Sequence, residues 1–253
     1  AEDRACVSPN RPAGTDDGGE AAKQASLSSS WAAGFTPLPG YRLVARLGRG
    51  GFGEVWRADG PGDVPVALKR VELGTRCGDI ELEALRLLRS VRHPHLLALH
   101  GYWIQDDLLI IACELADESL LALLRRRASE GQSGLSSGEV ISYLADAAEG
   151  LDYLNRPIHR VNSHSMRILH RDVKPANLLL QGGRVKVADF GLAKALENVV
   201  EAHTSSMTLQ YAPPEFFQGL TSVNSDQYSL AVTYYELRTG RPLFAGSARD
   251  ILE

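Results

Sequence analysis

Residues 170–191 constrain this chain more than any other stretch. The segment begins HRDVKPAN and ends DFG, which places Asp172, Lys174, Asn177 and Asp189 on short loops between apolar runs. Two carboxylates, an ammonium group and an amide at this spacing suit a metal-bound polyphosphate and a hydroxyl nucleophile. An aspartate after an arginine is usually only a surface ion pair, so other segments must agree before the chemistry is assigned.

A glycine-rich turn lies between two segments of alternating hydrophobicity. Residues 41–47 and 54–58 each alternate as strands do, and the sequence GRGGFG fills 48–53. This glycine spacing alone is weak, because it also opens dinucleotide-binding folds. Those folds need a helix directly after the glycines, whereas here a second strand follows. We therefore expect a β-hairpin whose tip places backbone N–H groups over phosphates.

Further strands and helices follow along the chain. Residues 64–69 (VPVALK) read as a strand that ends in a lysine, and 107–114 read as a buried strand. Residues 79–91 are helical in pattern, and apolar residues recur every three or four positions over 137–154. The segment 137–154 is the strongest helical signal in the chain.

Taken together, these motifs resemble the eukaryotic-type Ser/Thr protein kinases. The glycine-rich hairpin, VALK, HRDVKPAN and DFG follow one another in that family's order, and the resemblance covers residues 41–253. It implies an α+β fold of two lobes, with an antiparallel five-stranded sheet and one helix in 39–116 and a mainly helical lobe in 117–253. ATP and Mg²⁺ are expected between the lobes. The helical lobe is expected to be C-terminally incomplete.

The resemblance gives each charged side chain of the two loops a role. Asp172 would accept or orient the proton of the substrate hydroxyl, and Lys174 would neutralise the phosphoryl group in transfer. Asn177 and Asp189 would hold Mg²⁺. Lys69 would contact the α- and β-phosphates of ATP.

Lys69 needs a carboxylate partner that fixes its position in this family. The helical stretch 79–91 offers Glu81 and Glu83. We prefer Glu83, because Leu87 lies one helical turn beyond it and can face the core. The distance from Glu83 to the following His-Pro pair is one residue longer than is usual in the family.

Contacts to the nucleotide are implied in the same way. The backbone from Glu114 to Ala116 would form the hinge that bonds the adenine edge, with Cys113 as the gatekeeper residue behind it. The other positions expected around the nucleotide are Gly48, Gly50, Gly53, Val55, Ala67 and Leu179.

Two structural features are also implied. His170 and Phe190 are expected to stack with Leu87 and Leu99 into an apolar column that links the lobes. Asp226 resembles a buried aspartate that anchors the backbone of the catalytic loop in this family.

The substrate class follows from the resemblance at Thr208 and Lys174, which imply protein substrates with Ser or Thr acceptors. Residues 192–211 correspond to the activation loop, and dimerisation for autophosphorylation is expected. Its candidate phosphorylation sites are Thr204, Ser205 and Ser206. Glu215, in the sequence APPE, has no evident arginine partner. A pseudokinase should lack Lys69, Asp172 or Asp189, and a small-molecule kinase should lack the activation loop with its APPE sequence.

Composition bounds the remaining possibilities. The formal charge of −4 gives no reason to expect a nucleic-acid surface, and no apolar run is long enough to span a membrane. The 3 cysteines form no CxxC pair, so we expect reduced thiols in a cytoplasmic domain. Residues 1–38 are expected to be a disordered leader. Residues 155–167 resemble an insertion of some bacterial eukaryotic-like Ser/Thr kinases, or else form a plain surface loop.

Overall fold

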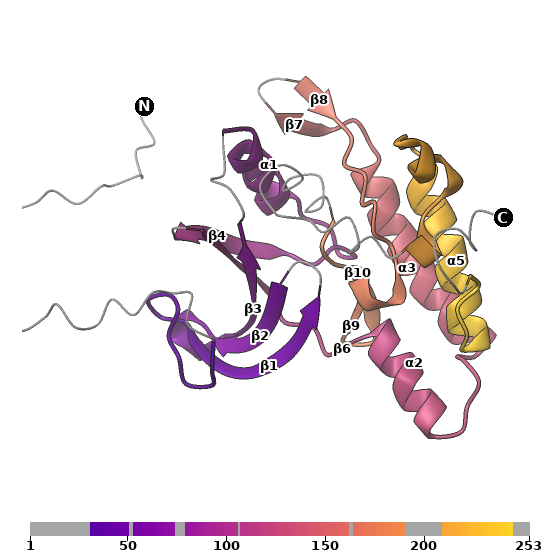
Figure 1. Cartoon of the computed structure of the whole chain (residues 1–253), viewed down its shortest axis with the longest axis horizontal. Coiled ribbons are helices and arrows are strands. Elements are labelled where there is room, and N and C mark those ends of the chain that lie inside the picture. The colour runs from indigo at the N-terminus through magenta and orange to yellow at the C-terminus, as the bar shows by residue number, and fades with distance from the viewer. Residues whose placement is uncertain are drawn as a thin grey trace, which may run out of the picture. The chain divides into compact units, whose positions relative to one another are not determined.

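The computed structural model describes residues 31–50, 53–73, 79–105, 107–161, 164–190 and 209–244. Its first half contains one antiparallel sheet in the order β1-β2-β3-β5-β4. The strands are β1 (Arg42–Gly50), β2 (Gly53–Asp59), β3 (Pro65–Glu72), β4 (Leu99–Gln105) and β5 (Leu108–Glu114). Helix α1 (Asp79–Ser90) follows β3 (Figure 1). The predicted five-stranded sheet with one helix is confirmed.

Alternation along the strands sorts the side chains of this sheet onto two faces. Lys69 is directly opposite Val55 on β2 and Ile111 on β5, so all three point to the same side. Leu68, one residue earlier, points to the other side with its cross-strand neighbour Trp56. Ile111, Leu68 and Trp56 are all buried. The sheet therefore has apolar packing on both faces, and the lysine lies on the face shared with the main core.

Order begins earlier than the predicted boundary at residue 38. Trp31 is 5% exposed and Leu38 is 2% exposed. The N–H of Gly34 donates to the Leu43 carbonyl, and the Phe35 carbonyl accepts from the Leu43 N–H, both at 2.8 Å. These bonds place the segment beside β1, so the prediction of a disordered leader does not hold for residues 31–38. Residues 1–30 lie outside the described part of the chain.

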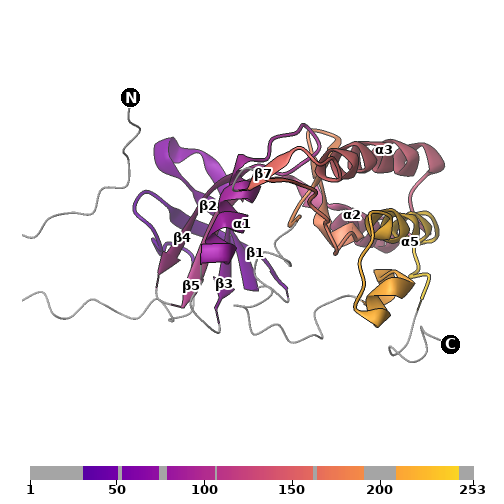
Figure 2. The same cartoon turned by 90° about the horizontal axis from the view of Figure 1, so that it is seen from above.

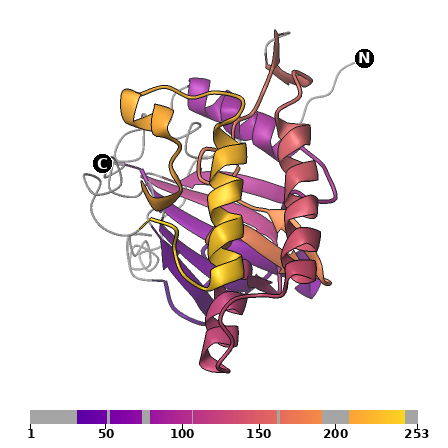
Figure 3. The same cartoon turned by 90° about the vertical axis from the view of Figure 1, so that its right-hand side faces the viewer.

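The second half of the chain is mainly helical. Its helices are α2 (Leu120–Ser129), α3 (Ser137–Leu154) and α5 (Ser225–Thr239). Figures 2 and 3 show α3 and α5 side by side. Short 3₁₀ turns lie at Pro61–Asp63, Pro175–Asn177, Leu209–Tyr211 and Pro214–Gln218. Helix α3 begins with a capping box, in which Ser136 and Glu139 each bond the other's backbone N–H.

Two small sheets complete the second half. Strands β6 (Glu118–Ser119), β9 (Leu178–Gln181) and β10 (Arg184–Val187) form a sheet in the order β10-β9-β6. Strands β7 (His159–Val161) and β8 (His164–Met166) form a separate antiparallel hairpin between α3 and residues 170–177, the predicted catalytic loop. The segment 155–167 thus contains regular structure.

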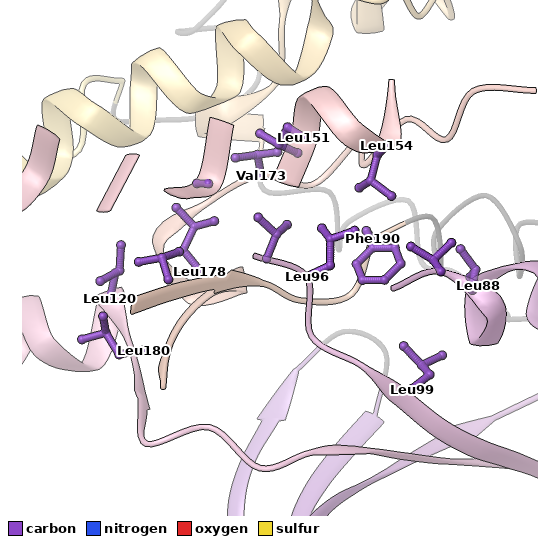
Figure 4. Packing of buried hydrophobic residues seen from close by; sticks show 14 of the residues in the cluster. Leu88, Leu96, Leu99, Leu120, Leu151, Leu154, Val173, Leu178, Leu180 and Phe190 are labelled. Carbon is purple, nitrogen blue, oxygen red and sulfur yellow. The ribbon is translucent and has the colours of Figure 1, made fainter. Parts of the chain in front are cut away.

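One apolar cluster connects the two halves of the fold. Leu88 of α1 and Leu99 of β4 belong to the same cluster as Leu154 of α3 and Phe190, with Leu87 packed against it (Figure 4). Of the predicted column between the lobes, Phe190, Leu99 and Leu87 therefore pack together, whereas His170 is not a member of this cluster. Within the described residues, no helix is both long enough and apolar enough to cross a lipid bilayer.

Helix α3 approaches the segment before β4 very closely. A Cβ atom added to Gly150 would lie 2.7 Å from the carbonyl oxygen of His95, closer than Cβ atoms ordinarily come. Glycine therefore lets α3 pack directly against this backbone. The contact places the C-terminal end of α3, and the catalytic loop that follows it, against the strands of the first half.

Candidate active site

The catalytic loop is anchored by a buried carboxylate on α5. Asp226 is 2% exposed, and its two oxygens accept the backbone N–H groups of His170 and Arg171 at 2.8 Å each. Arg171 has a φ of +68°, a left-handed conformation that costs a residue other than glycine free energy. The two hydrogen bonds hold the backbone in this conformation. The predicted anchoring role of Asp226 is confirmed.

His170 connects the loop that carries Asp172 to the loop that carries Asp189. Its side chain is fully buried, its Nδ1 lies 3.2 Å from the N–H of Asp172, and its Nε2 lies 2.8 Å from the carbonyl of Ala188. A backbone N–H only donates and a carbonyl only accepts, so Nδ1 accepts and Nε2 carries the proton. Neutral His170 therefore fixes Asp172 relative to the residue that precedes Asp189.

Asp172, Lys174 and Asn177 form one contact group. The Nζ of Lys174 lies 2.9 Å from Oδ1 and 2.7 Å from Oδ2 of Asp172. The side-chain Nδ2 of Asn177 donates to Oδ2 at 2.9 Å and to the Asp172 carbonyl at 2.7 Å. Both carboxylate oxygens are thus held in place, and the three predicted side chains are together.

Lys69 reaches across from the sheet to the second acidic loop. Its Nζ lies 2.6 Å from Oδ2 of Asp189, and its side chain is only 8% exposed. Burial alone would raise the pKa of Asp189, but the charge and hydrogen bond of Lys69 lower it below its ordinary value. Asp189 has a φ of +59°, so this loop also contains left-handed backbone. The sheet and the catalytic loops therefore share one site.

The predicted ion pair between Lys69 and Glu83 is not formed. Oε1 of Glu83 instead accepts from Arg86, one turn along α1, at 2.5 Å, and about a third of the Glu83 side chain is exposed. Positions three apart on a helix are neighbours, which makes this local pair the easier one to form. The side chain of Glu81, the alternative, lies outside the described residues.

The face of the sheet around Lys69 carries the positions predicted to contact a nucleotide. Val55 is opposite Lys69, and Ala67 is opposite Cys113, so these residues point to the same side. Leu179 is half-buried on β9. Burial raises the pKa of the Cys113 thiol to about 12.

The glycine-rich hairpin forms as predicted, with Gly48 opposite Val55 and Gly50 opposite Gly53. The residues at its tip, 51 and 52, lie outside the described part. Gly53 has a φ of +111°, and an added Cβ would lie 1.8 Å from the Arg70 carbonyl oxygen. No other residue fits at this position without moving β3.

The segment after β5 has the form of the predicted hinge. The N–H of Glu114 donates to the Ala98 carbonyl at 3.0 Å, and the Leu115 carbonyl accepts from the side chain of Gln181 at 2.9 Å. Among the described residues, the N–H of Ala116 donates to no protein acceptor. Ala116 is thus the hinge position with a donor left for a ligand.

The Glu114 side chain makes contacts that sequence reasoning missed. Lys186 of β10 donates to both carboxylate oxygens, at 3.1 and 3.0 Å, and the Ala98 N–H donates at 3.2 Å. Burial raises the pKa of Glu114, but these bonds outweigh it and leave the pKa below its ordinary value. No signal in the sequence connects residues so far apart.

Two side chains have the donor chemistry for Mg²⁺. Within the described protein Asn177 uses only its amide nitrogen, and Asp189 uses one carboxylate oxygen, so each keeps an oxygen for a ligand. No group of three or more His, Cys, Asp or Glu side chains in the described ranges could hold a metal ion. Mg²⁺ commonly binds one or two protein oxygens together with substrate phosphates. Asn177 and Asp189 fit a metal ion that is bound in this way.

Comparison with known proteins decides the family. The model of the protein kinase domain matches residues 41–253. This chain belongs to the protein kinase family. The predicted kinase fold and the resemblance to protein kinases are thereby confirmed.

Two plant receptor kinases illustrate the relationship. This kinase domain is 37% identical over 216 residues to the leucine-rich repeat receptor protein kinase MSL1 of Oryza sativa subsp. japonica, covering 82% of this chain and 15% of that protein. It is 31% identical over 254 residues to LysM domain receptor-like kinase 10 of the same organism, covering 97% of this chain and 40% of that protein. The chain therefore spans less than half the length of either relative.

The last residue of the predicted activation-loop segment, Tyr211, is also fixed to α5. The hydroxyl of Tyr211 donates to the buried Glu236, and Ser229 donates to the Tyr211 carbonyl at 2.8 Å. Burial, with the bond to Glu236, raises the pKa of Tyr211 above its ordinary value. Residues 191–208 lie outside the described part, and with them Thr204, Ser205, Ser206 and Thr208.

Glu215 of the APPE sequence has partners that the sequence did not indicate. Its Oε1 accepts from the hydroxyls of Ser222 at 3.0 Å and Ser225 at 2.7 Å. These bonds, that of Ser225 above all, lower the pKa of Glu215. In the described part of this kinase domain, serine hydroxyls therefore occupy Glu215, and it forms no ion pair there.

Proposed function

We propose that this kinase domain transfers the γ-phosphoryl group of ATP to Ser or Thr hydroxyls of protein substrates. The contact between Lys174 and Asp172 carries the proposal. It places an ammonium group 2.7 Å from the carboxylate that would receive the acceptor hydroxyl. A fixed positive charge at this point stabilises the negative charge that develops on the phosphoryl group. Lys174 also supports Ser and Thr as acceptors, by resemblance to the Ser/Thr kinases.

Asp172 has the surroundings of a residue that orients a nucleophile. Asn177 and Lys174 bond its carboxylate, and the N–H of Asp172 is held by His170. The acceptor hydroxyl would donate its hydrogen to this carboxylate, which aims the hydroxyl oxygen at the γ-phosphorus. Fixing the two reacting groups in line supplies much of the rate increase in phosphoryl transfer.

The nucleotide would lie between the sheet and the two loops. Ala116 N–H and the Glu114 carbonyl would bond the adenine edge, with Val55 and Ala67 above the ring and Leu179 below it. The Lys69 ammonium group, which contacts Asp189 here, would also contact the α- and β-phosphates. The glycines Gly48, Gly50 and Gly53 would lie over the phosphates. Mg²⁺, held by Asn177 and Asp189, would neutralise phosphate charge when bound.

A phosphotransfer assay tests the proposal. The full chain is incubated with γ-³²P-ATP, Mg²⁺ and a generic protein acceptor, and the labelled amino acids are separated after hydrolysis. We expect label on Ser and Thr, and a loss of at least about 100-fold in Asp172→Asn. Asp152→Asn is the matched control, because Asp152 is exposed on α3.

The same assay separates the alternatives. Equal labelling by wild type and Asp172→Asn would contradict the assigned role of Asp172. Label on tyrosine would contradict the acceptor class while leaving the kinase family intact. Transfer to small molecules alone would favour a small-molecule kinase, and absence of transfer would favour a pseudokinase.

Two wider features are part of the proposal. The domain is proposed to act in the cytoplasm and to phosphorylate itself within a dimer. At concentrations where gel filtration shows monomers, autophosphorylation between two copies would make the initial rate rise with the square of the protein concentration. A rate that rises only in proportion to concentration in that range would contradict transfer between two copies.

A further inference from the structure

Strand β7 of the β7–β8 hairpin has a buried residue, His159, next to an exposed one, Arg160. His159 is directly opposite Met166, and Arg160 is directly opposite Ser165. Opposite residues share a face, and successive residues alternate. His159 is 5% exposed, whereas Arg160 and Ser165 are exposed. Met166 is 42% exposed, so His159 is the packed member of that pair, and a length-tolerant surface loop would not need its contact.

His159 connects the hairpin to the end of helix α3. Its ring meets the Tyr153 ring edge-on, with 5.3 Å between centroids and 76° between planes. Its Nε2 lies 3.1 Å from the Tyr153 carbonyl, and Nε2 carries the hydrogen because a carbonyl only accepts. One ring and one hydrogen bond thus fix β7 to the last turn of α3.

Tyr153 continues this contact to the segment after α1. Its ring also stacks on the ring of His93, with 4.9 Å between centroids and 25° between planes. The Nδ1 of His93 accepts the N–H of His95 at 3.2 Å, which fixes the orientation of the ring. His93 lies three residues beyond Ser90, the last residue of α1. Three rings therefore join the hairpin, α3 and the end of α1.

The hairpin also lies directly beside α1. Strand β7 and α1 have Cα atoms within 8 Å of each other, and α1 packs against β4 as well (Figures 1 and 2). The end of α1 is tied to β4 by Arg92, which donates to the carbonyls of Arg89 and Leu99 at 2.5 and 3.2 Å. A strand from the second half of the chain thus supports a helix of the first half.

We propose that the β7–β8 hairpin positions helix α1 for phosphoryl transfer, with His159 as the positioning residue. Helix α1 packs against β4, and Lys69 of β3, Ile111 of β5 and Tyr102 of β4 lie in one cross-strand row. A fixed α1 therefore steadies the part of the sheet that carries the lysine. The effect on catalysis rests on the proposed function. The effect on α1 itself does not.

Hydrogen–deuterium exchange of α1 tests the structural half of the proposal. In His159→Ala, amides of residues 79–90 are expected to exchange two- to tenfold faster, the range for loss of one aromatic pair. Amides of residues 137–150 in α3 should not change. Arg160→Ala is the control, because Arg160 is the next residue and points outward. His159→Phe keeps the ring and should restore most of the protection.

Nucleotide kinetics test the other half. The kcat/KM for Mg-ATP is expected to fall two- to tenfold in His159→Ala at temperatures where the fold is intact, and to stay unchanged in Arg160→Ala. If His159→Ala does not fold, a variant with a Gly-Ser link from Ile158 to Arg167 gives the same comparison.

Each outcome decides one statement. Unchanged α1 exchange in a folded hairpin variant overturns the proposal. Faster α1 exchange with unchanged kcat/KM overturns its catalytic half. If wild type transfers no phosphoryl group, the proposed function fails, and the exchange measurement still decides whether the hairpin holds α1.

Discussion

Replacing Asp226 with asparagine should destabilise this kinase domain strongly, although the two side chains have the same shape. The carboxylate accepts two backbone N–H groups at 2.8 Å each, from a position only 2% exposed. An asparagine has a single oxygen, so one N–H would face an amide NH₂ group that cannot accept. Hydrogen bonds to charged groups contribute about 1.5–3 kcal/mol, and a buried unsatisfied N–H costs about 1–3 kcal/mol.

The free energy of unfolding should fall by about 3 kcal/mol. The fall is smaller than the sum of these two costs, because the neutral amide avoids the cost of burying a charge. That is a large part of a total stability of about 5–15 kcal/mol. Urea unfolding followed by tryptophan fluorescence measures it. With an m-value of about 2–3 kcal/mol/M, the midpoint should fall by about 1–1.5 M.

Asp152→Asn is the matched control, since Asp152 is exposed on α3 and its midpoint should not move. Phosphotransfer by Asp226→Asn should also fall, because Arg171 would lose one of the bonds that hold its left-handed backbone. A midpoint equal to that of wild type would refute the inference that Asp226 anchors the catalytic loop energetically.

Three further predictions concern other groups. Arg184→Met should lower the free energy of unfolding in urea by about 2 kcal/mol, because Arg184 donates twice to Asp146, whose side chain is 6% exposed. Arg126→Met removes an exposed pair with Glu118 and should lower it by less than about 1 kcal/mol. The thiol of Cys113 has a pKa raised to about 12, so it should react with iodoacetamide at pH 8 about 1,000-fold more slowly in folded than in unfolded protein. Mass spectrometry of its peptide measures the labelling, and fast labelling of the folded protein would contradict the raised pKa. The lowered pKa of Glu114 means that its ion pair with Lys186 stabilises the fold above the unfolded pKa of about 4.3 and is lost as pH falls through the lower folded value. The difference in unfolding free energy between wild type and Glu114→Gln should therefore narrow below that pH, and a constant difference would count against the pair.

The parts of the site that could be predicted are those whose spacing is fixed by the chemistry. Asp172, Lys174 and Asn177 are close in sequence, so a short loop brings them together whatever surrounds it. The glycine-rich hairpin was predictable because apolar and polar residues alternate along β1 and β2, and β5 was predictable because its apolar run is continuous.

Other features could not be predicted, for physical reasons. Glu83 was predicted as the partner of Lys69 from its position on the helix, but its carboxylate pairs with Arg86, three residues along the same helix. The β7–β8 hairpin is short and polar, so it carries no alternation that pattern reading could detect. Order at Trp31 depends on one buried ring beside a proline- and glycine-containing segment, which has the composition of a linker.

The left-handed backbone at Arg171 and Asp189 has a consequence for heat inactivation. Each such residue costs of order 1–3 kcal/mol, which the surrounding bonds must offset. Local unfolding therefore relieves backbone strain in the catalytic loops, whereas it would relieve none in α3 or α5. On warming, the enzyme should lose turnover at temperatures where its far-ultraviolet circular dichroism still shows intact helices.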